Sequence, residues 1–194
     1  MLKKTVFSAI LMILISLNGL YAQNDPTSAN ILRKVENTYK QFKNIDTQFK
    51  LTIEIPEYDN EVQEGRLMLM DDMFRVEMSN QDIICDNSTI WTHLKDVNEV
   101  QVNYYETDEN TISPTQLFTV YKSDYSSYYQ GEKMINGSKN HIIDLIPNDK
   151  DQPYFKIRLI INTATNLFSA FQVFAKDGTN YLYDIVSFQK NISL

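Results

Sequence analysis

Residues 81–105 read QDIICDNSTIWTHLKDVNEVQVNYY, and their pattern predicts three short antiparallel strands in a row. Residues 83–85 and 89–94 are mostly apolar, and they flank a polar turn at residues 86–88. The short side chains of that turn bond their own backbone and tolerate left-handed conformations, so a hairpin is expected. After a second turn, residues 100–104 alternate between apolar and polar side chains, which is the pattern of a half-buried strand.

Upstream of this stretch, the sequence predicts an amphipathic helix. Asp25 can cap it, and Pro26 fits the first helical position because its missing amide hydrogen would have no partner there. Apolar residues recur at intervals of three and four, with charged residues on the opposite face. This pattern predicts a helix that ends near Asn44.

Period-two alternation returns at residue 47 and dominates the rest of the chain. Further strands are expected at residues 47–55, 65–70, 74–78, 141–146, 155–161, 167–175 and 181–188. Asp177 and Gly178 form the strongest hairpin signal, because a tight turn needs the positive φ that they tolerate. Roughly ten short strands with helical interruptions predict an α+β fold built on a strongly curved antiparallel sheet or partial barrel.

One of those interruptions follows the meander. Residues 113–116 read SPTQ, with Ser as the cap and Gln at the third helical position, which is a capping box. Leu117 and Phe118 then begin an apolar surface. A short helix inserted among strands is expected to lie across a sheet face or an opening.

The first 22 of the 194 residues have the composition of a cleaved signal peptide. Lys3 and Lys4 precede an apolar run that is too short to span a bilayer of about 30 Å, which argues against a membrane anchor. A mature domain of residues 23–194 is expected, without a second domain. Loss of the two lysines takes the net charge from −7 to −9, so nucleic acid and anionic lipid are disfavoured partners.

The sequence offers no recognisable catalytic constellation. His93 and His141 lack metal-ligand spacing and are expected at the surface or at a rim. Cys85 is the one cysteine of the sequence, so it cannot form an internal disulfide. Its pattern favours a buried residue of the core over a nucleophile. No phosphate loop, dinucleotide fingerprint or nucleophile elbow occurs. We therefore expect a binding protein, not an enzyme, with no cofactor and no metal.

The meander also carries a resemblance to the LolA family, the periplasmic carriers of outer-membrane lipoproteins. Residues 84–100 resemble the family's polar turn, Leu-Trp strand and Gln/Glu-Val strand, here ICDNSTIWTHLKDVNEV. Residues 65–67 (GRL) and 74–77 (FRVE) are similar to two further family segments, and residues 113–118 stand where the family has a short helix over the cavity mouth. One departure is clear: the family's lid-latching arginine is replaced at residues 71–72 by Asp-Asp.

This resemblance implies an incomplete barrel wrapped over helices, with an apolar cavity that receives acyl chains. It implies a monomeric carrier in the periplasm that moves lipoproteins towards the outer membrane. Acylated lipoproteins or lipid, an inner-membrane lipoprotein-releasing complex and an outer-membrane acceptor would be its partners. The candidate residues for the cavity wall and the lid are Phe49, Leu67, Leu69, Phe74, Val76, Trp91, Leu117, Phe118 and Phe171.

Three alternatives stay open at this point. The protein could carry another lipid or act as a sensor of mislocalised lipoproteins. An enzyme acting on lipids would need a base that the sequence does not reveal. Trp91, the one tryptophan, is either a wall residue or an ordinary core residue, depending on which face of its strand points inward.

Overall fold

The computed structural model describes residues 25–105 and 124–192, and it begins with the predicted helix, α2 (Pro26–Tyr39). The Asp25 carboxylate accepts a hydrogen bond from the Thr27 amide at 2.8 Å, and Pro26 occupies the first turn, as the sequence predicts. The helix ends at Tyr39, several residues before the predicted end near Asn44, because the first strand already begins there.

Eleven strands follow among the described residues: β1 (Asn44–Glu54), β2 (Glu61–Met70), β3 (Met73–Met78), β4 (Gln81–Cys85), β5 (Thr89–Leu94), β6 (Glu99–Tyr104), β7 (Tyr125–Ile135), β8 (Ser138–Pro147), β9 (Tyr154–Asn162), β10 (Phe168–Ala175) and β11 (Asn180–Lys190). The predicted turn at Asp177 and Gly178 joins β10 to β11, and Gly178 has a φ of 92°. The predicted second helix, residues 113–118 included, lies outside the described residues, as do residues 1–22.

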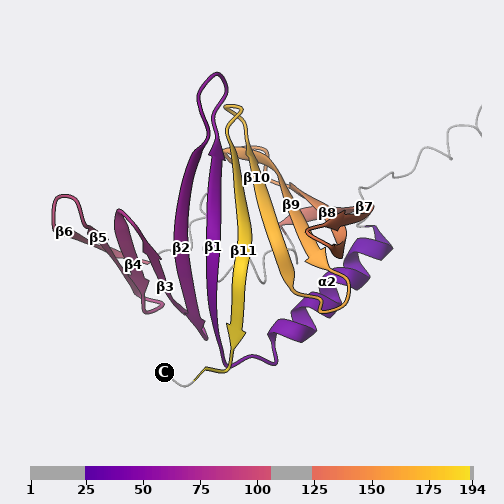
Figure 1. The fold of residues 1–194 in the computed structure, drawn as a ribbon, viewed down its shortest axis with the longest axis horizontal. Coiled ribbons are helices and arrows are strands. Elements are labelled where there is room, and N and C mark those ends of the chain that lie inside the picture. The colour runs from indigo at the N-terminus through magenta and orange to yellow at the C-terminus, as the bar shows by residue number, and fades with distance from the viewer. Residues whose placement is uncertain (1–24, 106–123, 193–194) are drawn as a thin grey trace, which may run out of the picture.

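All eleven strands form one antiparallel sheet in the order β6-β5-β4-β3-β2-β1-β11-β10-β9-β8-β7. The strand that follows the helix therefore pairs with the last strand of the chain at the centre of the sheet (Figure 1). Strands β6 and β7 are its two ends and do not pair with each other, so the sheet is curved but not closed. The predicted fold class, α+β with an incomplete barrel, is confirmed.

The predicted meander is confirmed as β4, β5 and β6, but the expected half-burial of its last strand is wrong. Every residue of β6 is exposed. Alternation along a strand indicates that its two faces differ in polarity. It does not indicate whether another layer of the protein covers the apolar face. Here β6 is one of the two edge strands of the described sheet.

Two irregularities decide which side chains point into the curve of the sheet. Gln48 pairs with Ser187 and Phe49 with Ile185, so Val186 is an extra residue in β11. This bulge keeps both Ile185 and Phe188 on the inner face, although they are an odd number of residues apart. A similar shift between Phe168 and Ala170 in β10 places Phe168 and Phe171 on the same side.

Helix α2 lies at the β7–β10 end of the molecule and supplies one wall of the core (Figure 1). Ile31, Leu32 and Val35 are buried on it, and they join the inward residues of the sheet in one cluster. Tyr39 closes the helix end of this cluster, with its ring centroid 5.4 Å from that of Phe168. The Tyr39 hydroxyl accepts a hydrogen bond from the Phe168 amide at 3.1 Å.

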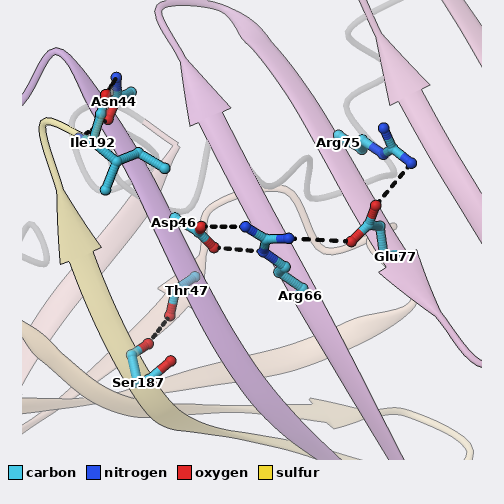
Figure 2. A network of polar contacts seen from close by, with 8 residues as sticks. All are labelled: Asn44, Asp46, Thr47, Arg66, Arg75, Glu77, Ser187 and Ile192. Atoms are coloured by element: carbon cyan, nitrogen blue, oxygen red, sulfur yellow. Dashed lines mark hydrogen bonds and ion pairs between the residues drawn. The ribbon is translucent and has the colours of Figure 1, made fainter. Parts of the chain in front are cut away.

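The outer face of β1–β3 carries a polar network that holds these strands in register (Figure 2). Arg66 on β2 donates to both carboxylate oxygens of Asp46 on β1, through Nε at 2.8 Å and Nη2 at 2.5 Å. Glu77 on β3 lies 3.8 Å from the same guanidinium and pairs with Arg75 at 2.8 Å. Hydrogen bonding to Arg66 lowers the pKa of the Asp46 carboxyl below its ordinary value.

We expect Asp46→Asn to lower the free energy of unfolding at neutral pH by roughly 1–2 kcal/mol, because a bidentate, partly buried hydrogen-bonded pair is lost. The pKa of Asp46 is lower in the folded protein, so its stabilisation is present above the unfolded pKa of about 3.9 and disappears as pH falls through the folded pKa. Chemical denaturation of both proteins across pH 3–7 should therefore give curves that converge in acid. A constant difference at every pH would contradict this role of the carboxylate.

Candidate functional site

A cavity of about 450 Å³ opens on the inner face of the sheet. It runs between the β1–β4 half and the β9–β11 half, with the end of α2 at one side. Most of its lining is apolar. The lining residues are Tyr39, Thr47, Phe49, Leu51, Ile53, Gln63, Leu67, Val76, Met78, Asn80, Gln81, Ile83, Leu159, Phe168, Phe171, Val173, Tyr183, Ile185 and Phe188.

Aromatic rings form much of the wall on the central strands. The rings of Phe171 and Tyr183 stack with centroids 4.5 Å apart and planes 16° apart. The Phe49 ring lies 6.0 Å from that of Tyr183. Desolvation raises the pKa of the Tyr183 hydroxyl, so this group stays neutral at physiological pH. The wall is therefore uncharged and suited to an apolar ligand.

Gly65 leaves the space that the Phe49 ring occupies. The two residues are directly opposite each other on β2 and β1. A Cβ atom on Gly65 would stand 2.8 and 2.9 Å from Cε1 and Cε2 of Phe49, and closer still to Cζ. The Phe49 ring therefore packs closely against the β2 backbone at Gly65, where it forms part of the cavity wall.

The polar groups of the lining are not spread evenly. At the helix end, the Thr47 hydroxyl donates to the Ser187 carbonyl at 2.7 Å, so this group is already satisfied by the protein. At the opposite end, where β3 turns into β4, the lining includes Asn80 and Gln81, and no hydrogen bond of their side-chain amides to another described residue is observed. This end can offer hydrogen bonds to a ligand.

The structure brings part of the predicted site together. Phe49, Leu67, Val76 and Phe171 line the cavity. Leu69 and Phe74 are buried in the adjoining core, 7% and 6% exposed, and do not reach the cavity surface. Leu117 and Phe118 lie outside the described residues.

Trp91 lies on the other face of the sheet. It pairs with Ile84 on one side and Val102 on the other, and directly paired residues share a face. Ile84 and Val102 are 41% and 59% exposed, whereas the adjacent Cys85 is buried on the inner face. Trp91 is half-buried on this outer face and does not line the cavity.

Sequence reasoning missed the contribution of β11. Tyr183, Ile185 and Phe188 line the cavity because β11 is the central neighbour of β1. The alternation of residues 181–188 was a usable signal for the first two. The bulge at Val186, which turns Phe188 inward, has no such local signature.

No Asp, Glu, His, Cys, Lys or Arg among the described residues lines the cavity. The Cys85 thiol is buried, and burial raises its pKa, which makes it a poor nucleophile. His141 lies 3.2 Å from the Tyr129 hydroxyl and 3.6 Å from Glu132, and burial lowers the pKa of its imidazole. Within residues 25–105 and 124–192, no three His, Cys, Asp or Glu side chains are placed to hold a metal ion.

The fold and the cavity define an open half-barrel that can enclose an apolar ligand. Residues 40–194 match the family model described as outer membrane lipoprotein carrier protein LolA. This match spans most of the sequence, so the chain belongs to the LolA family, a family of carriers and not of enzymes. No protein among the curated sequences matches it.

Solved structures share the fold at low sequence identity. An uncharacterized conserved protein from Thermus thermophilus is 13% identical, with a TM-score of 0.59 over 87% of this chain and 90% of that one. The lipoprotein LppX of Mycobacterium tuberculosis is 10% identical, with a TM-score of 0.55 over 88% of this chain and 99% of that one. At such identities the likeness concerns the fold alone.

Among residues 25–105 and 124–192, no helix is both long and apolar enough to cross a bilayer.

Proposed function

We propose that this protein is a periplasmic carrier that encloses lipoprotein acyl chains and moves lipoproteins towards the outer membrane. Residues 1–22 direct export and are cleaved. The carrier receives its cargo from an inner-membrane releasing complex and delivers it to an outer-membrane acceptor. The observation that carries this proposal is the uncharged apolar cavity in a member of the LolA family.

The energetic need for such a cavity is large. Each methylene group held in water costs about 0.8 kcal/mol, so a chain of ~16 carbons costs on the order of 12 kcal/mol. A bare acyl chain therefore does not leave a membrane for water at a useful rate. A cavity walled by Phe49, Phe171 and Tyr183 replaces most of that water contact with apolar contact.

The size of the cavity limits what it encloses. A methylene group fills about the volume of one liquid water molecule, roughly 30 Å³, so 450 Å³ holds about fifteen of them. This is the length of one fatty acyl chain. Any further chain of the cargo would have to lie along the open side of the sheet.

The uneven polarity of the cavity favours one orientation of the chain. The methyl end fits the helix end, where the Tyr39 and Thr47 hydroxyls are already bonded within the protein. The ester or amide that joins the chain to its headgroup fits the end with Asn80 and Gln81, whose amides can bond to it.

We expect the delipidated mature protein to bind one acyl chain per molecule. Titration with a fluorescent fatty acid gives the stoichiometry, and native mass spectrometry of protein purified from the periplasm identifies the natural occupant. Absence of any binding, with the fold intact by circular dichroism, would overturn the cavity as the functional site.

A second experiment tests the transport role separately from binding. Inner-membrane vesicles that carry a labelled lipoprotein and the releasing complex are incubated with ATP and the purified protein. The proposed carrier should bring lipoprotein into the soluble fraction as a one-to-one complex. Acyl-chain binding without any release would point instead to a carrier of another lipid or to a sensor.

A further inference from the structure

The apolar residues of β6 face solvent, although most strands direct theirs into the core. Val100, Val102 and Tyr104 are 55%, 59% and 87% exposed on the outer face. With Trp91 and Ile84, which follow on β5 and β4, they form a row that we call the edge patch. The polar residues of β6 lie on its inner face. In this strand the apolar side chains therefore point outward and the polar side chains point inward, the reverse of the strands that line the cavity.

The backbone N–H and C=O groups of the same three residues have no hydrogen-bond partner within the described residues. The Tyr105 amide donates to the Ser88 carbonyl at 2.8 Å, which makes Thr89 and Tyr104 a non-hydrogen-bonded pair of the β5–β6 ladder. Because bonding alternates along a strand, the N–H and C=O groups of Val100, Val102 and Tyr104 all point away from β5. They point to the open edge, where no other described strand pairs with them.

In contrast to β6, the edge strand at the other end of the sheet, β7, has part of its outward backbone covered. On β7, the Ser127 carbonyl accepts a hydrogen bond from the Asp25 amide, and the Tyr129 amide donates to the Asp25 carboxylate. The cap of α2 thus covers that edge. A bulge before Gly131 and charged residues further along the strand also disfavour pairing. Strand β6 has neither a bulge nor a lysine.

We propose that β6 pairs antiparallel with β6 of a second copy of this chain, with Val102 on the twofold axis. In this register Val102 faces Val102 and Val100 faces Tyr104 of the other copy. The outward N–H and C=O groups then meet in hydrogen-bonded pairs, and the two edge patches become one continuous row. The expectation of a monomer from the sequence is replaced by this proposal.

Charge favours the antiparallel arrangement. Glu99 is the one charged residue of β6. Antiparallel pairing about Val102 separates the two copies of Glu99 by about 20 Å, beyond the Debye length at physiological salt. Parallel pairing in register would place them side by side. Tyr105, the residue after β6, turns inward, and its ring lies 5.9 Å from that of Phe74.

A lipid surface is a poorer occupant of the same patch. Inserting the edge patch into hydrocarbon would bury the unpaired N–H and C=O groups of β6 without partners, at a cost of several kcal/mol each. A second strand satisfies these groups and covers the valines at the same time. Because one strand pair buries little area, we expect a weak, concentration-dependent dimer.

Sedimentation velocity of the mature protein, from micromolar to about millimolar concentration, tests the proposal. We expect a monomer–dimer equilibrium. Val102→Lys should raise the dimer dissociation constant at least tenfold, because two ammonium groups would then face each other across the axis. Val186→Lys is the matched control, since Val186 is 65% exposed on the outer face of an interior strand and should leave the equilibrium unchanged.

A charge swap tests the register itself. Val102→Lys and Val102→Glu should each be monomeric, and an equimolar mixture of the two should dimerise again, because residue 102 lies opposite itself. Circular dichroism and acyl-chain binding confirm that each variant is folded. A monomer at every concentration, or a dimer that Val102→Lys does not weaken, would overturn the proposal. So would a monomer in which Val102→Lys abolishes binding to phosphatidylcholine vesicles, because the patch would then be a lipid-docking surface.

Discussion

Val173→Trp should weaken acyl-chain binding about fiftyfold without unfolding the protein. Val173 lines the cavity from β10, between Ile157 of β9 and Tyr181 of β11. An indole at this position displaces on the order of three methylene groups of the ligand, at about 0.8 kcal/mol each. The loss of ~2.4 kcal/mol corresponds to the fiftyfold rise in the dissociation constant. Space is already present, so overpacking costs the fold little.

Val186→Trp is the matched control for this substitution. It changes the same residue types on the neighbouring strand, but its side chain is on the outer face. Titration with a fluorescent fatty acid should give wild-type affinity for Val186→Trp and a fiftyfold weaker affinity for Val173→Trp. Equal affinities for the two variants, with both folded, would mean that the acyl chain does not occupy this cavity.

The local elements of this fold can be predicted from sequence because short-range physics determines them. The Asp25 cap, the hairpin at Gly178 and the three strands of the meander each follow from side-chain pattern and turn chemistry. The order of the strands in the sheet, by contrast, depends on contacts between residues that are far apart in the sequence. The pairing of β1 with β11 joins residues about 140 positions apart, and no local pattern encodes it.

The same distinction explains the candidate site. Phe49 belongs to an alternating strand, Leu67 and Phe171 belong to strands that are apolar on both faces, and the structure puts all three on the cavity wall. For Trp91 the sequence leaves the wall and the core open, and the structure places it on the outer face, because the local pattern does not determine which face of a strand points inward. The exposure of β6 was missed for that reason, and it follows only from the position of the strand at the edge of the sheet.

Gly65→Ala should destabilise the protein by roughly 1–2 kcal/mol, against the trend for glycine in a strand. Without other effects, Gly→Ala stabilises by about 0.4–1 kcal/mol, because it reduces the conformational freedom of the unfolded chain. Here the new methyl group would overlap the ring of Phe49, and overpacking of this kind costs about 1–3 kcal/mol. The clash exceeds the entropic gain, so the net sign reverses.

The displaced ring can move in one direction, towards the cavity, because the β2 backbone blocks the other side. Gly65→Ala should therefore also weaken acyl-chain binding, by about tenfold if the ring takes the place of two methylene groups. Gly65→Ala thus affects both stability and acyl-chain binding through the Phe49 ring. Replacing that ring by a smaller side chain should remove both effects of the substitution.

A double-mutant cycle with Phe49→Leu tests this coupling. In the Phe49→Leu background the ring is gone, so Gly65→Ala should be neutral or stabilising, which gives an interaction energy of about 1–3 kcal/mol in denaturant titrations. If Gly65→Ala costs the same in both backgrounds, the glycine is needed for some other property of β2. If it stabilises the wild-type protein, the Phe49 ring does not pack over Gly65, and the cavity wall is arranged differently on this side.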